Sequence, residues 1–165
     1  MNQPVLTAEE LVAWNDKTAE HWRDLLEAHP HLLAVPCDVA GVKTVGELMQ
    51  HIVAAQLRYA ERLSGSPATA YEEIGYGTPA ELFATHAQGI DLFRRLLADP
   101  AYDWDEEVEF VTRRAGTLVA TRKTFFIHAM THGIRHYAQL ATLARQHGVT
   151  PDWPMDYLFM GARWA

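Results

Sequence analysis

The sequence has a single cysteine, Cys37, among its 165 residues. One cysteine excludes an intrachain disulfide and is typical of proteins kept in a reducing compartment. No segment approaches the roughly 20 apolar residues that a transmembrane helix requires, and the first residues lack the pattern of a secretory signal. We therefore expect a cytoplasmic protein with no membrane span, in which Cys37 acts as a small packing residue.

Positive charge is also scarce, because 14 Lys and Arg stand against 21 Asp and Glu, for a formal net charge of −7. Nucleic-acid affinity depends on clustered basic side chains. The basic cluster of Arg113, Arg114, Arg122 and Lys123 is small, and we interpret it as a solvated hairpin. We therefore expect a small-molecule substrate and no nucleic-acid partner.

The length and the 48% apolar content fit one domain over residues 1–165. Three Thr-x-x-Glu patterns have the spacing of a helix-capping box, and they begin at Thr7, Thr44 and Thr78. They predict three helices, from about Thr7 to before Pro30, from about Val45 to Leu63, and from about Pro79 to Ala98.

The stretch EVEFVTRRAGTLVATR, residues 107–122, alternates apolar and polar positions around Gly116 and predicts a short β-hairpin. A fourth helix is expected from about Lys123 to His147, with Gly148 as its C-cap. The aromatic-rich tail after Pro151 is expected to fold back onto the helices. The fold class predicted from these elements is all-α, a four-helix bundle with a small β-hairpin before the last helix.

Three histidines, His128, His132 and His136, are spaced four apart within the fourth predicted helix. At 100° per residue, Phe125 and Leu143 fall within about 20° of His132, so this is the core face of the helix. Two histidines at i and i+4 can bind one metal ion. The outer pair is separated by about 12 Å along the axis, so all three do not share one ion.

Solvated histidines, or histidines packed in the core, are the alternatives to a metal site on this helix. The other histidines of the predicted helices and loops are expected to be surface or capping residues, namely His21, His29, His31, His86 and His147.

A third ligand must come from another helix, and His51 is the candidate, at the border of the apolar face of the second helix and in line with Arg58. If the second and fourth helices are antiparallel, His51 meets His132 and His136. If they are parallel, it meets His128 and His132. Periodicity leaves both arrangements open.

The sequence has a histidine early in the second predicted helix, then a hairpin, then the stretch IHAMTHGIRHYAQLATLARQHG at residues 127–148. This layout resembles the DinB/YfiT family of small bacterial metalloproteins. The usual family motif ends in His-His-Arg-Gly-Gln. This sequence has Arg135, His136, Tyr137, Ala138 and Gln139 there. The departures at Tyr137 and Ala138 affect the surroundings of the ligands rather than the ligands.

The resemblance implies an up-down-down-up bundle with an antiparallel second and fourth helix, and so a metal site formed by His51, His132 and His136. Arg135 and Gln139 lie on the same side of the fourth helix and are expected to orient substrate or the metal ligands. Ni, Zn, Fe and Mn all suit this expectation, since the ligand type does not separate them.

Three neutral imidazoles leave a divalent ion with its full charge and an open position, at which a water or a thiol is acidified. Some DinB-like proteins are similar to S-transferases that use a low-molecular-weight thiol. We therefore expect a metal-dependent thiol S-transferase acting on small electrophiles. The alternatives are a metal-dependent hydrolase and a bundle that binds a small molecule or metal without catalysis. Relatives of this kind also suggest a homodimer.

Overall fold

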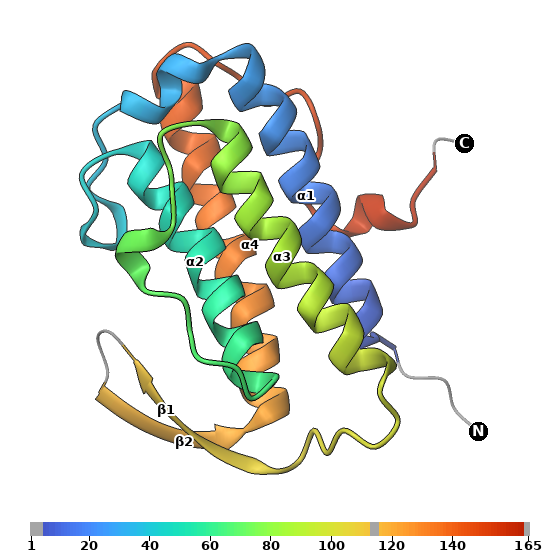
Figure 1. Ribbon diagram of the computed structural model, residues 1–165. Helices are drawn as coiled ribbons and strands as arrows, with labels where there is room; N and C mark the ends of the chain where they lie inside the picture. Colours follow the sequence, from blue (N-terminus) through green and yellow to red (C-terminus); the bar gives the residue numbers. More distant parts are fainter. Residues whose placement is uncertain (1–4, 113–115, 164–165) are drawn as a thin grey trace.

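The computed structural model describes residues 5–112 and 116–163 (Figure 1). Within them it is mostly helical, with a two-stranded antiparallel sheet. The main elements are α1 (Ala8–Ala28), α2 (Val45–Leu63), α3 (Pro79–Ala98), β1 (Glu107–Thr112), β2 (Gly116–Thr121) and α4 (Arg122–Gln146). Arg113 and Arg114, half of the predicted basic cluster, lie outside the described residues.

Threonine caps explain where the helices begin. The side chains of Thr7 and Thr78 each accept a hydrogen bond from the backbone N–H three residues later, and the side chain of the glutamate there accepts one from the threonine backbone N–H. Thr44 makes the first of these bonds, but the Glu47 side chain accepts from the Lys43 N–H instead. The predicted bounds of α2 and α3 are confirmed.

The end of α4 differs slightly from the prediction. The C-cap residue is His147, and Gly148 follows it with a φ of 80°. This left-handed conformation favours glycine. Gly148 therefore ends the helix from the position after the cap.

The buried apolar residues form two clusters at different levels of the helices. One contains Trp22, Leu48 and Leu140, and the other contains Phe93, Phe126 and Met130. The hairpin joins the second cluster through Phe110, whose ring stacks on Phe125 at a centroid distance of 4.1 Å. The hairpin is thereby fixed beside the first turn of α4 (Figure 1).

Helices α2 and α4 lie side by side and run in opposite directions (Figure 1). Tyr59, late in α2, stacks on Phe125 at the start of α4. His51, early in α2, contacts His132 farther along α4. This direction brings the first turns of α2 level with the middle of α4.

The aromatic tail packs against α1, as predicted. The Trp14 indole N–H donates to the Met155 carbonyl at 3.2 Å, and Trp153 stacks on His21 at a centroid distance of 5.1 Å. Over residues 5–112 and 116–163, no helix has the length and apolar character needed to cross a membrane.

Candidate metal centre

His51 of α2 and His132 and His136 of α4 converge at one point between the two helices. One ring nitrogen from each lies within 4.8 Å of the other two. The ring centroids are 4.5 to 5.0 Å apart. His132 and His136 are buried, whereas His51 is half-buried and faces a pocket. Of the two arrangements that periodicity allowed, the structure has the antiparallel one.

His136 is held in one tautomer by its neighbours. Its Nδ1 lies 2.6 Å from the Gln139 side-chain oxygen, which only accepts, so Nδ1 carries the proton. Its Nε2 accepts from the Arg135 guanidinium at 3.2 Å, and a guanidinium only donates. The lone pair of His136 therefore lies on Nε2. Gln139 and Arg135, both expected near the site, contact the same imidazole.

His132 is neutral at physiological pH. Burial, followed by the neighbouring His51 and His136, lowers the pKa of His132 to about 2. Neutral imidazole is the form that binds a metal. Among the described residues, the buried Nδ1 of His132 has no hydrogen-bond partner, while its Nε2 lies 3.0 Å from Nε2 of His51.

The three imidazoles fit a divalent ion. Zn–N bonds of about 2.0–2.1 Å at tetrahedral angles place ligand nitrogens about 3.3 Å apart. The 3.0 Å between the His51 and His132 nitrogens is close to that separation. A cation between them would accept both lone pairs, whereas without one a proton must lie between the two nitrogens.

His128 lies beside the site rather than in it. Its ring is 5.4 Å from that of His132 and 5.5 Å from that of Tyr59, and it is exposed. Cys37 is buried in an apolar cluster, and its sulfur accepts from the Val39 N–H at 3.4 Å. Cys37 is thus a packing residue, as expected.

His86 was expected to be a surface or capping residue, and this prediction is wrong. It is buried on α3, with Nδ1 2.8 Å from the Gln56 side-chain oxygen and Nε2 3.2 Å from Asp16. Gln56 in turn donates to Asn15 at 3.1 Å, and Arg94 pairs with Asp16. The spacing could have located His86, because Leu82 and Ile90 lie four residues to either side and share its buried face.

A pocket of about 930 Å³ opens beside the three histidines. Its walls come from α2, α4, the segments before and after α2 and the β-hairpin. Its polar lining residues include His51, His128, His132, His136, Arg58, Arg62, Arg135, Gln139, Tyr59 and Glu72. This volume lies within the range of roughly 300–1,000 Å³ typical of small-molecule sites.

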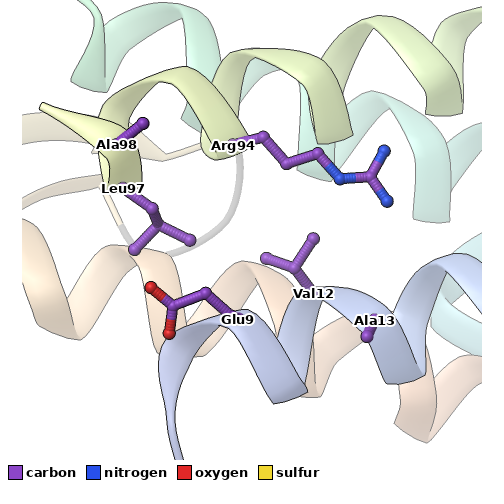
Figure 2. Close-up of a pocket in the computed structure, with 6 residues that line it drawn as sticks. All are labelled: Glu9, Val12, Ala13, Arg94, Leu97 and Ala98. Carbon is purple, nitrogen blue, oxygen red and sulfur yellow. The ribbon is translucent and has the colours of Figure 1, made fainter.

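A second pocket of about 240 Å³ lies between the start of α1 and the end of α3 (Figure 2). Figure 2 shows Glu9 and Val12 on one side and Arg94 and Leu97 on the other. It holds no group of metal-binding side chains among the described residues. The group of three histidines lines the larger pocket.

Comparison with family models matches residues 1–163 to the DinB family. The chain belongs to the DinB family. No curated protein gives a match to this sequence. Two findings therefore bear on function. The chain is a member of the DinB family, and it has a cluster of three histidines that could hold a metal ion.

Proposed function

We propose that this DinB-family protein binds one divalent metal ion through His51, His132 and His136 and transfers a low-molecular-weight thiol to a small electrophile. The observation that carries the proposal is the convergence of three imidazole nitrogens within 4.8 Å at the wall of a substrate-sized pocket. A metal held there would leave an open position facing that pocket and would lower the pKa of a thiol bound at it.

The protein's own part is to orient ligands and to receive the substrate. Gln139 accepts the Nδ1 proton of His136 and so leaves the lone pair of that ring on Nε2, the nitrogen that contacts Arg135 and that would bind a metal. The low pKa of His132 keeps that side chain unprotonated over the physiological range. No protonation change is then needed before His132 binds a metal.

The composition of the pocket supports thiol transfer over hydrolysis. Glu72 is the single carboxylate among the described residues that line it, and Glu72 is exposed. Many hydrolytic sites place a carboxylate base beside the attacking water, and His128 is the one other histidine among the described lining residues that could take that part. A thiol needs no such base once the metal has lowered its pKa.

An up-down-down-up order of the four helices is part of this proposal. The opposite directions of α2 and α4 support it. So does the contact of Asp16, early in α1, with Arg94, late in α3. The Gln50 amide, early in α2, also donates to the Ile74 carbonyl at 2.6 Å just before α3, as parallel α2 and α3 require. We further propose that residues 1–165 form one domain, that the protein is cytoplasmic and that it forms a homodimer.

Metal content of the untagged protein tests the metal site. We expect about one Ni, Zn, Fe or Mn ion per chain by elemental analysis, and loss of that ion in His51→Ala and His132→Ala. His31→Ala is the matched control, because His31 is exposed and lies outside the site. Metal content unchanged in both site variants would contradict the proposed ligands.

Turnover is tested separately with the metal-loaded protein, a panel of small thiols and an electrophilic haloarene. We expect thiol consumption that depends on the metal and is lost in His132→Ala. Stoichiometric metal with no acceleration for any thiol would instead favour a non-catalytic binding protein. Ester cleavage without a thiol would favour the hydrolase.

A further inference from the structure

Three arginines line the pocket that holds the histidine cluster. They are Arg58 and Arg62 of α2 and Arg135 of α4. Among the described residues, the pocket has one lining carboxylate, that of Glu72. The formal net charge of the whole protein is −7. The sign of the charge in the pocket is thus opposite to that of the whole molecule.

These guanidinium groups lack carboxylate partners. Over the described parts of the chain, none of the three takes part in an ion pair, although Arg23, Arg94, Arg95 and Arg122 each do. Arg58 donates to the Thr69 carbonyl, and Arg62 donates to the Val111 carbonyl at 2.7 Å. The nearby Glu61 is bound to Thr69, through its backbone N–H at 2.7 Å and its hydroxyl at 2.5 Å.

Each arginine is therefore positioned by one neutral contact and keeps its charge and other donors. A guanidinium has five N–H donors, so most of those on Arg58 and Arg62 remain for a ligand. Arg62 is further fixed over the Phe110 ring at 5.5 Å. Rigidly held guanidinium groups are the side chains that best recognise carboxylate and phosphate groups.

Arg58 and Arg62 lie at one end of the pocket, and the histidines lie at the other end together with Arg135, which contacts His136. Arg58 follows His51 by seven residues and Arg62 follows it by eleven, which places them about 10 and 16 Å farther along α2. Ala55 lies between His51 and Arg58 on α2, and the apolar lining of the pocket also includes Ala68, Val111 and Leu118. A ligand that spans this distance needs an apolar middle.

We propose that the pocket binds an organic anion whose carboxylate or phosphate pairs with Arg58 and Arg62, whose apolar body lies along Ala55 and Leu118, and whose far end reaches the histidines. This inference rests on the proposed function in one respect, since it names the substrate class of the same pocket. The anion site itself is formed without any metal ligand, so the two can be tested apart.

The test compares hexanoate, hexyl phosphate and the neutral hexanamide by NMR titration of the metal-free protein. Metal-free protein is used because a carboxylate could otherwise bind the metal directly. We expect at least one of the two anions to bind tenfold or more tightly than hexanamide, and its binding to weaken as salt is raised. The tighter of the two anions identifies the head group.

Variants locate the anion. Arg58→Gln combined with Arg62→Gln should weaken binding of the preferred anion at least tenfold, while hexanamide binding stays within twofold. Arg58→Lys keeps the positive charge but not the planar guanidinium, so it should lose less affinity for the anion than the double glutamine variant. Arg145→Gln is the control, since Arg145 is exposed, contacts Thr142 and does not line the pocket.

Circular dichroism of each variant shows whether it is folded, and the lysine variant keeps the test informative if the double glutamine variant unfolds. Equal binding of hexanoate, hexyl phosphate and hexanamide, or an unchanged affinity in the folded variants, would overturn the anion site. Titration of the same proteins with Ni, Zn, Fe and Mn separates the two proposals. Metal bound without any anion preference overturns the anion site alone. Anion binding in a protein that takes up none of these metals supports the anion site while contradicting the metal centre.

Discussion

The side-chain oxygen of Gln139 lies 2.6 Å from Nδ1 of His136, one helical turn away on α4. This contact fixes the tautomer and the plane of a ring that also faces His51 and His132. Hydrogen bonds of this kind, to the second nitrogen of a metal-binding histidine, raise the basicity of the ligand and limit its rotation.

Gln139→Leu should therefore weaken zinc binding by about 10- to 100-fold, the usual cost of losing such a contact. The affinity is measured by competition with a chromophoric chelator at pH 7.5. Gln146→Leu serves as the control, because Gln146 is exposed in the last turn of α4. An affinity in Gln139→Leu equal to that of the control would show that the contact does not support the site.

Zinc should also raise the thermal stability of the protein. Zinc at a free concentration 100-fold above its dissociation constant stabilises the folded state by about 2.7 kcal/mol. For a chain of this length that is a rise in Tm of roughly 5–11 °C. The rise is expected to disappear in His132→Ala and after addition of EDTA, as followed by circular dichroism. A similar rise in His132→Ala would place the zinc elsewhere.

Gly89→Ala should destabilise the fold at the contact of α2 with α3. A Cβ at Gly89 would lie 3.1 Å from the backbone N and Cα of Leu57, and a helical backbone has little freedom to move away. We expect a loss of about 1–3 kcal/mol in the free energy of unfolding, as is common for overpacking. Urea denaturation measures it, with Gly161→Ala as the control because a Cβ there meets nothing within 4 Å. Equal stability of the two variants would contradict the prediction and would mean that α2 and α3 move apart enough to accept the added methyl group.

Stability should fall at acid pH in part through Asp16. A hydrogen bond from His86, reinforced by Arg94, lowers the pKa of Asp16 below its usual 3.8. A carboxyl whose folded pKa is depressed stabilises the protein above its unfolded pKa, and that stability is lost as the pH falls through the folded value. Urea denaturation at pH 7 and pH 3 should therefore show a smaller decrease for Asp16→Asn than for the wild type. The same decrease in both proteins would show that Asp16 does not contribute to the loss of stability at acid pH.

The sequence predicted the helices well because their ends depend on local chemistry. Thr44 and Thr78 cap the helices that follow them through bonds to residues three positions later, which spacing alone can identify. His132 and His136 could be found in the same way, as an i, i+4 pair on one face of a helix. Which of the histidine pairs meets His51 could not be predicted from spacing, because it depends on the relative direction of α2 and α4.

The buried network around His86 was missed because its members are dispersed over the sequence. His86 bonds to Gln56, 30 residues away, and to Asp16, 70 residues away. A single polar residue on an apolar helix face resembles a surface residue until its partners are known. Two more such residues, Asn15 and Gln56, lie on the buried faces of α1 and α2, and these three together were a sign of buried polar contacts.

The two apolar clusters leave a polar layer between them. Asn15, Gln56 and His86 occupy this layer on one side of Gly133, and a Cβ at Gly133 would lie 3.0 Å from Asn15 and 3.1 Å from Gln56. His132 precedes this glycine, so the proposed ligands lie at the level where apolar packing is interrupted. A metal ion there would act as a cross-link between α2 and α4. Amide hydrogen exchange would then slow most in the turns around His51 of α2 and in the middle of α4, at the level of this polar layer.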